Sequence, residues 1–256
     1  MHRKRVVLIT GAVRNTGLAI AEAFAEAGAT VVLNGRKSAD VAREAARLRE
    51  QYGATVVEAT ADVAQQDQVD AMFAMIKREC GRLDVLVNNA ILQGCGYNLV
   101  DTPRELLEEV FRVNVFGAYA CAQGAARLMI EQGRGAIVNI GSTTAERPIR
   151  MRTAYCASKA AIDGLTRAMA VELGPHSVRV NCVVAGYIRT PRWDDIGDEQ
   201  AARRRANIPL GFEATGRDIA ESVLFLAGDG AANITGTRLV VDGGTLSQLV
   251  PADCDG

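Results

Sequence analysis

Short apolar runs rich in β-branched residues alternate along the chain with longer Ala-rich segments whose apolar positions recur at helical spacing. The short runs are nearly continuous in apolar residues, which is typical of parallel strands buried on both faces. They predict strands at Val6–Thr10, Thr30–Leu33, Thr55–Glu58, Asp84–Asn88, Ala136–Ile140, Val178–Val184 and Arg238–Val241. The longer segments predict helices at Leu18–Ala27, Ala39–Gln51, Gln66–Glu79, Pro103–Ile130, Ala154–Leu173 and Asp218–Leu226. This alternation, with no linker or repeat, indicates one domain over residues 1–256. It is a three-layer α/β domain with a doubly wound parallel sheet.

One segment, 187–215, does not follow this alternation and is polar and irregular. A long excursion between core elements often forms a functional lid, so we expect a substrate loop here; the alternative is a solvated surface helix with loops. Its apolar residues Trp193, Ile196 and Phe212 give the segment only a weak apolar character. The run Arg203-Arg204-Arg205 is either a basic patch for a carrier protein or, by preference, a solvated helix face.

Composition excludes several classes of protein. Hydrophobic residues make up 48% of the chain and the formal net charge is -1. This share of hydrophobic residues is sufficient for a large core. The net charge shows none of the basic excess that is typical of a dedicated nucleic-acid binder. No window reaches the ~18 apolar residues of a membrane span. The basic start, Met1–Arg5, precedes only four apolar residues, fewer than the ~7–15 of a signal peptide. We therefore expect a cytoplasmic protein without membrane or nucleic-acid partners.

The six cysteines are scattered, with no C-x-x-C pair, and the only histidines are His2 and His176. A zinc site and a disulfide framework are therefore both disfavoured, and reduced thiols are expected.

A glycine-containing turn, Thr10–Gly17, follows the first predicted strand and opens the first helix. The free N–H groups and positive dipole end of a helix N-terminus suit a pyrophosphate, and small residues let the backbone approach it. The turn therefore favours nucleotide binding, with an ordinary tight turn between strand and helix as the alternative.

Further motifs follow in a fixed order. They are Gly11-x-x-x-x-x-Gly17, Asn88-Asn89-Ala90, Asn114 within Val113-Asn114-Val115, Gly141-Ser142, Tyr155-x-x-x-Lys159, Asn181-x-x-x-x-Gly186-x-x-x-Thr190 and Asp242-Gly243-Gly244. Taken together, these motifs resemble the pattern of the short-chain dehydrogenase/reductase family over residues 5–245. Within that family the chain is most similar to 3-oxoacyl-carrier-protein reductases and related small ketoreductases.

This resemblance implies a Rossmann-type fold, an NADP(H) or NAD(H) cofactor and a homotetramer built on the two longest predicted helices. It implies that the cofactor is bound by Gly11, Arg14, Asn15, Thr16, Gly17, Arg36, Asp62, Val63, Asn89, Ala90, Tyr155, Lys159, Gly186, Ile188 and Thr190. Three positions depart from the family pattern. Asn15 replaces a Gly but is the least costly substitute in left-handed geometry. Ile91 adds bulk near the cofactor ribose, and Ala185 replaces a Pro.

Four residues are expected to be catalytic. Reducing a ketone leaves negative charge on its oxygen, and Tyr155 is the candidate proton donor. Lys159 lies one helical turn on, where its ammonium should lower the pKa of the phenol. The family resemblance implies that Lys159 also binds the nicotinamide ribose. Ser142 would hold the substrate oxygen, and Asn114 would kink its helix and hold a water linking Lys159 to solvent. The alternatives are an exposed i, i+4 pair, a plain helix cap at Ser142 and a satisfied core amide at Asn114.

Cofactor choice depends on the end of the second strand. Gly35 stands where NAD-dependent members of the family usually have Asp, and Arg36 follows it. Together with Arg14, Arg36 could bind a 2′-phosphate through paired N–H donors, which favours NADP(H); the alternative is that both are solvated. Asp62 and Val63, at the end of the third strand, resemble the pair that contacts adenine in the family; the alternative is that Asp62 caps a helix.

The sequence thus predicts NADPH-dependent reduction of a ketone, with a 3-oxoacyl thioester as the favoured substrate. An NAD(P)-dependent alcohol or sugar dehydrogenase and a pteridine-reductase-like enzyme are the alternatives among enzymes. A nucleotide-binding sensor without catalysis is the alternative outside them.

Overall fold

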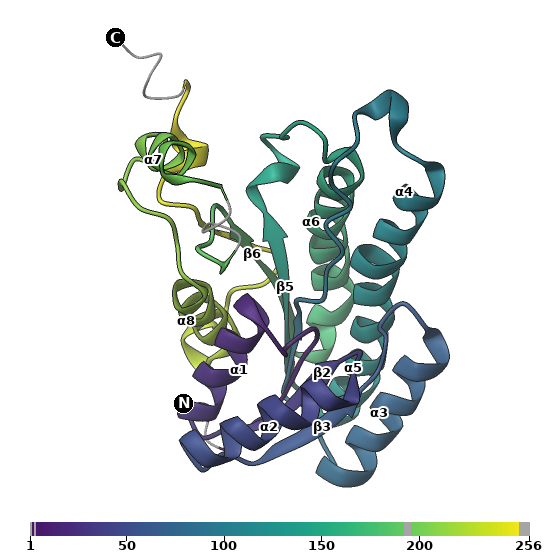
Figure 1. Ribbon diagram of the computed structural model, residues 1–256. Coiled ribbons are helices and arrows are strands. Elements are labelled where there is room, and N and C mark those ends of the chain that lie inside the picture. The colour runs from purple at the N-terminus through teal and green to yellow at the C-terminus, as the bar shows by residue number, and fades with distance from the viewer. Residues whose placement is uncertain (1, 3, 192–195, 251–256) are drawn as a thin grey trace.

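The computed structural model describes residues 2, 4–191 and 196–250 as a single parallel sheet with helices on both faces (Figure 1). The seven strands are arranged in the order β3-β2-β1-β4-β5-β6-β7, and every pairing is parallel. Their bounds are β1 Val6–Ile9, β2 Thr30–Gly35, β3 Val56–Thr60, β4 Val85–Asn88, β5 Gly135–Ser142, β6 Val178–Ala185 and β7 Arg238–Val241. The strand order reverses between β1 and β4, the position at which open α/β sheets bind ligands.

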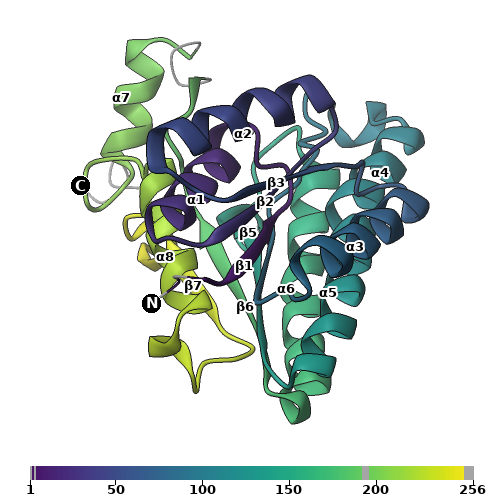
Figure 2. The ribbon, with the colours of Figure 1, turned by 90° about the horizontal axis from the view of Figure 1, so that it is seen from below.

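Helices α1, α2 and α8 cover one face of the sheet, and α3, α5 and α6 cover the other (Figure 2). The helix bounds are α1 Asn15–Glu26, α2 Ser38–Tyr52, α3 Gln66–Cys80, α4 Arg104–Phe111, α5 Ala118–Gln132, α6 Thr153–Leu173, α7 Asp198–Ala206 and α8 Gly216–Ala227. The three-layer α/β architecture predicted from the sequence is confirmed.

The core explains why the strands are apolar at every position. In β1, Val7 and Ile9 belong to the hydrophobic cluster beneath α1 and α8, whereas Val6 and Leu8 belong to the cluster beneath α3 and α5. All four side chains are buried. A strand covered on both faces removes every side chain from water, so no polar alternation remains.

The predicted long helix at Pro103–Ile130 is interrupted. A π-helical segment, Arg112–Gly117, separates α4 from α5 and contains Asn114. The expected local distortion at Asn114 is therefore present, and π-helical turns frequently occur at functional sites.

One strand end predicted from the sequence needed correction, and segment 187–215 has secondary structure of its own. Strand β5 extends through Gly141 and Ser142, which were expected to follow it. Segment 187–215 contains a helix, α7, and its two ends pair with each other because Ile188 and Ala214 form a parallel bridge. Trp193 lies outside the described residues.

Three general features bear on the function classes. No helix in the described part of the chain is long and apolar enough to cross a membrane. Cysteines 80, 95, 121, 156 and 182 are free thiols, while Cys254 lies outside the described residues. Within the described ranges, no group of His, Cys, Asp and Glu side chains could hold a metal ion.

Candidate active site

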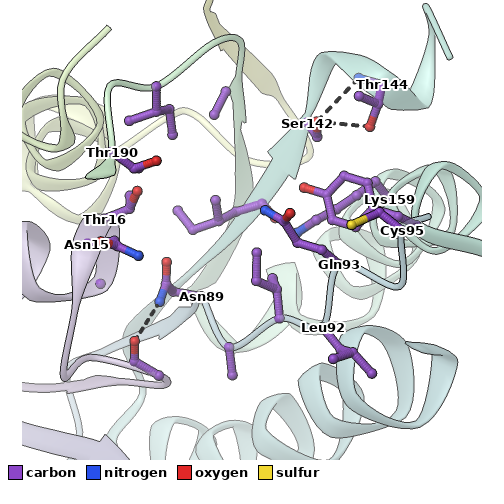
Figure 3. Close-up of a pocket in the computed structure, with 18 of the residues that line it drawn as sticks. Asn15, Thr16, Asn89, Leu92, Gln93, Cys95, Ser142, Thr144, Lys159 and Thr190 are labelled. Atoms are coloured by element: carbon purple, nitrogen blue, oxygen red, sulfur yellow. Dashed lines mark hydrogen bonds between the residues drawn. The ribbon is translucent and has the colours of Figure 1, made fainter. Parts of the chain in front are cut away.

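A cleft of about 1450 Å³ opens at the carboxyl ends of the strands. Every residue that the sequence indicated for cofactor binding or catalysis lines it, with the exception of Asn114. Figure 3 shows Asn15, Thr16 and Thr190 on one side and Ser142, Gln93 and Lys159 on the other. We call the part near Arg14 and Arg36 the β2 end, and the part near Tyr155 the α6 end.

The glycine turn has the tight geometry that a phosphate site requires. Gly11 has a φ of +61°, and a Cβ there would lie 2.9 Å from the Cα of Ala90. A Cβ at Gly17 would lie 2.4 Å from the backbone oxygen of Gly11. Asn15 has a φ of +48°, so left-handed geometry is required where the family pattern has Gly, and Asn tolerates it.

Thr10 and Asn89 hold the turn against the loop that follows β4. The Thr10 hydroxyl accepts hydrogen bonds from the backbone N–H groups of Asn89 and Ala90, at 3.0 and 3.1 Å. The side-chain amide of Asn89 donates to the carbonyls of Thr10 and Gly11, at 2.9 and 3.0 Å. The amide of Asn89 is thus used to position protein backbone, and its role is to fix the width of the cleft between β1 and β4.

The β2 end presents cations. Arg14 and Arg36 are exposed, line the cleft and form no ion pair within the described residues. Asp62 lies two residues beyond the end of β3 and accepts a hydrogen bond from the backbone N–H of Ala64 at 3.0 Å. Because α3 begins only at Gln66, the helix-cap alternative for Asp62 is wrong. The Val63 side chain packs closely against Gly117 of the π-helical segment.

Ser142 is positioned by Thr144, a residue that the sequence analysis missed. The hydroxyl oxygen of Ser142 accepts hydrogen bonds from the Thr144 hydroxyl at 2.9 Å and from its backbone N–H at 3.3 Å (Figure 3). Ser142 therefore does cap a short 3₁₀ turn, as the alternative interpretation held. A hydroxyl has two acceptor sites and one donor, so its own proton is left to donate into the cleft.

Tyr155 and Lys159 are buried rather than exposed, with 8% and 3% of their surface accessible. The exposed i, i+4 pair considered from the sequence is therefore excluded. The ammonium of Lys159 donates to the backbone carbonyl of Ile140 at 2.6 Å and lies 5.7 Å from the centre of the Tyr155 ring. Burial lowers the pKa of Lys159 to about 8.

The pKa of Tyr155 does not follow the expectation from the sequence. Burial raises the pKa of this phenol above its usual value, while Ser142 and the positive charge of Arg152 act in the opposite direction. Desolvation outweighs nearby charges here because the phenolate has little solvent around it. The predicted lowering by Lys159 is wrong for this structure, and Tyr155 is a protonated acid at neutral pH.

Asn114 uses its side chain within the protein. Its amide exchanges two hydrogen bonds with the backbone of Leu92, at 2.7 and 2.9 Å, and donates a third to the hydroxyl of Ser158 at 2.9 Å. This is the satisfied core amide that was the alternative interpretation. The bonds connect the π-helical segment to the loop after β4 and to α6.

The residues after β6 complete the rim of the cleft. A Cβ at Gly186 would lie 2.6 Å from the Cβ of Asp242, so this strand end needs glycine. Ile188 and Thr190 line the cleft beyond it, and Ala185 does so at the end of β6. Ile91 is 42% exposed on the opposite wall, so its added bulk lies within the cleft.

Charged side chains hold segment 187–215 together internally. The guanidinium of Arg205 donates to both carboxylate oxygens of Glu213, at 2.7 and 2.8 Å, and holds the pKa of that carboxyl at about 2. The guanidinium of Arg204 lies 5.5 Å from the ring centre of Tyr187. Because these two arginines have separate partners inside the segment, the run 203–205 is not one continuous basic patch.

Comparison with known proteins adds to this geometry. A family model described as enoyl-(acyl carrier protein) reductase matches residues 11–245. L-rhamnose 1-dehydrogenase (NAD(P)(+)) from Azotobacter vinelandii is 38% identical, over 96% of this chain and 98% of that protein. 3-Oxoacyl-acyl-carrier-protein reductase from Chlamydia trachomatis is 35% identical, over 94% and 96%.

A gluconate 5-dehydrogenase from Burkholderia cenocepacia, solved in complex with NADP and tartrate, matches with a TM-score of 0.91 and 32% identity. The match covers 96% of this chain and 97% of that one. The shared length, the motifs and the cleft lead to one conclusion: this chain belongs to the short-chain dehydrogenase/reductase family of nicotinamide-dependent oxidoreductases.

Proposed function

We propose that the protein reduces a ketone to an alcohol with NADPH, and that Tyr155 donates the proton. The observation that supports this most strongly is the buried Tyr155, facing Ser142 and Lys159 at one end of a cleft whose other end has the glycine turn. A 3-oxoacyl thioester of the carrier-protein type is the favoured substrate.

The residues present fit a dinucleotide. Asn15, Thr16 and Gly17, the first residues of α1, line the cleft at the turn where side chains at Gly11 and Gly17 would collide with backbone. Such an N-terminus suits the pyrophosphate. Lys159 would hold the nicotinamide ribose, and Asp62 and Val63 would contact the adenine.

The reaction needs one hydride and one proton for each carbonyl group. The nicotinamide supplies the hydride when bound. Tyr155 gives its proton to the carbonyl oxygen, and Ser142 donates a hydrogen bond to that oxygen as negative charge develops on it. Burial raises the pKa of Tyr155, so the phenol carries the proton that the reduction consumes.

NADPH is proposed over NADH because of charges at the β2 end. Arg14 and Arg36 approach it from two different loops, and neither has a carboxylate partner among the described residues. A 2′-phosphate would provide that partner. Asp40, the nearest acidic residue in sequence, forms an ion pair with Arg43 at 2.8 Å.

A sugar or alcohol dehydrogenase working in the oxidative direction is the second candidate. The rhamnose dehydrogenase is as similar to this chain as the 3-oxoacyl reductase, and the gluconate dehydrogenase shares its fold closely. A panel of ketones, 3-oxoacyl thioesters and sugars, assayed in both directions with both nucleotides, separates these candidates. Binding without turnover of any of them would instead support a sensor.

Segment 187–215 is proposed as a lid over the α6 end, since Tyr187, Gln200 and Arg204 line the cleft. The cytoplasm is the proposed location, and the free thiols fit its reducing conditions.

A homotetramer is proposed on the basis of exposed apolar side chains on the long helices. Phe116 is 62% exposed and Tyr119 44% exposed on the π-helical segment and α5, and Val171 is 78% exposed on α6. Equivalent helices could bury these side chains against each other across two-fold axes.

Replacing Tyr155 by Phe tests the reaction itself. The ring is retained and the acid is lost, so turnover should fall by roughly 10²–10⁴-fold, the usual contribution of general acid catalysis. Titration of NADPH fluorescence should show binding retained. Near-wild-type turnover in Tyr155→Phe would refute the assigned role.

The pH dependence of NADPH binding tests Lys159. In the free protein the ammonium loses its proton as the pH rises through about 8. Binding to a ribose hydroxyl favours the charged form, so affinity should be highest near pH 7 and fall roughly ten- to thirtyfold by pH 9.5. Calorimetry across this range should show weaker, pH-independent binding in Lys159→Met. A flat profile in the wild type contradicts the assignment.

Cofactor choice is tested at Arg36. A charge-assisted hydrogen bond contributes about 1.5–3 kcal/mol, so NADPH should bind at least roughly tenfold more tightly than NADH. Arg36→Ala should remove most of that difference. Gly35→Asp is a poor test, because a Cβ there would lie 2.8 Å from the Val13 side chain. Equal wild-type affinities would mean that both arginines are only solvated.

Light scattering tests the assembly. The wild type should have a mass near four times 27.2 kDa at micromolar concentration. Phe116→Glu should dissociate the tetramer by placing charge at a buried interface, whereas Val100→Glu, at a 90% exposed position outside these helices, should not. A monomeric wild type would disprove the proposal.

A further inference from the structure

We infer that the substrate has its own anionic group, a carboxylate or a phosphate, and that Arg152 binds it beside Tyr155. The inference rests on the proposed reduction and narrows its substrate class. It assigns a specificity-determining residue at the α6 end of the cleft, where the sequence motifs indicated only the catalytic residues.

Arg152 is placed next to the reacting position because it immediately precedes α6. It is the N-cap of α6, three residues before Tyr155, and both residues line the cleft. As the N-cap, Arg152 has non-helical backbone angles (φ −143°, ψ 30°) and lies beside the first turn of α6, the turn that carries Tyr155. The charge of Arg152 acts on the phenol and opposes the rise in its pKa, as expected for neighbouring side chains.

The guanidinium of Arg152 has no carboxylate partner among the described residues. Its hydrogen bond is to the side-chain oxygen of Gln93, at 3.4 Å, near the upper limit for such a bond. Other partly buried arginines are better satisfied: Arg205 is paired with Glu213, and Arg179 donates to the carbonyls of Leu226, Ile234 and Gly228. A guanidinium has five N–H donors, so Arg152 retains most of its binding capacity.

The rest of this wall is also positive. Arg147 and Arg150, in the loop that precedes α6, also line the cleft, and Arg147 donates to the backbone carbonyl of Thr245 at 2.9 Å. Among the described lining residues, the acids are Asp40 and Asp62 near the β2 end and Glu109 of α4. The field over the α6 end therefore attracts anions, and the N-terminus of α6 adds to it.

The geometry limits where the anion can be. Because the charge of Arg152 acts on the Tyr155 phenol and both residues line the cleft, we expect the acid group within a few bonds of the carbonyl that Tyr155 protonates. A short oxo acid, an oxo phosphate, or a thioester with an acid group on its acyl chain meets this condition. A guanidinium fork fits carboxylate and phosphate equally well, since both present two oxygens to it.

The test compares matched substrates that differ in charge. The pairs are 4-oxopentanoate with its methyl ester, and hydroxyacetone phosphate with hydroxyacetone. In the wild type, kcat/KM should be at least tenfold higher for the charged member of one pair, and the preferred pair distinguishes carboxylate from phosphate. In Arg152→Gln, the ratio of kcat/KM between the charged and the neutral substrate should fall towards one, because KM for the anion rises. Arg152→Lys should retain part of the preference for the anion.

Arg134→Gln is the matched control. Arg134 is exposed, at the start of β5 and therefore at the opposite end of the sheet, and it should leave the ratio unchanged. Thermal unfolding and NADPH binding show whether each variant is folded. A wild type that does not prefer either anion, or an Arg152→Gln variant that keeps the preference, overturns the inference.

A binding experiment separates this inference from the proposed reaction. Calorimetric titration of both anions into the NADP-loaded protein needs no turnover. Binding that depends on Arg152 without reduction of any ketone would support the anion site and contradict the reaction. Reduction of neutral ketones without a preference for charge would support the reaction and contradict the anion site.

Discussion

The pairing of β1 with β4 is the constraint on which the cleft depends. These strands are adjacent although β2 and β3 lie between them in the chain, so the loops that leave them diverge and open a crevice. Thr10 and Asn89 then fix the crevice with four hydrogen bonds between the two loops. Neither residue needs to touch a ligand to matter, because a shift between the loops would move the phosphate site relative to the catalytic side chains. The π-helical segment is a second constraint on the cleft, because its Asn114 connects the loop after β4 to α6.

The architecture follows from patterns that are local in sequence. Strands with apolar residues at every position, such as Val6–Ile9, can only be central strands of a covered sheet, and the Ala-rich segments between them can only cover it. The cleft was equally predictable, because its residues follow strand ends, and the carboxyl ends of parallel strands meet at one edge. Asn15 is an instructive case: its left-handed backbone was inferable from the glycine pattern alone.

What could not be predicted depends on burial and on side-chain direction. From the sequence, Lys159 should lower the pKa of Tyr155, but desolvation of the phenol raises it, and the opposing influences are Ser142 and the charge of Arg152. The amide of Asn114 could have faced water or backbone, and only the packing of Leu92 and Ser158 decides between them. Arg152 was indistinguishable from the other arginines until the absence of a carboxylate near it, within the described residues, became visible. Thr144 gave no signal either, because its effect on Ser142 arises from a turn that the sequence does not mark.

A final physical question is why the buried Lys159 keeps its charge, because burial of an isolated ammonium favours loss of its proton. Helix α6 answers it through its periodicity. Asp163 follows Lys159 by one turn on the same face and, with Cys182 of β6, raises the pKa of the amine against the effect of burial. Asp163 is itself only 8% exposed and is held by Arg238 at 3.0 Å, which keeps part of its own charge in place. The balance leaves the pKa of Lys159 at about 8, so the amine is charged at neutral pH but close to its titration point. Tyr155, Lys159 and Asp163 thus form one stripe along α6, and Arg152 is the N-cap that precedes it. In this stripe, the spacing of a single helix rather than separate loops positions the Tyr155 phenol, the Lys159 ammonium and the Asp163 carboxylate that stabilises its charge.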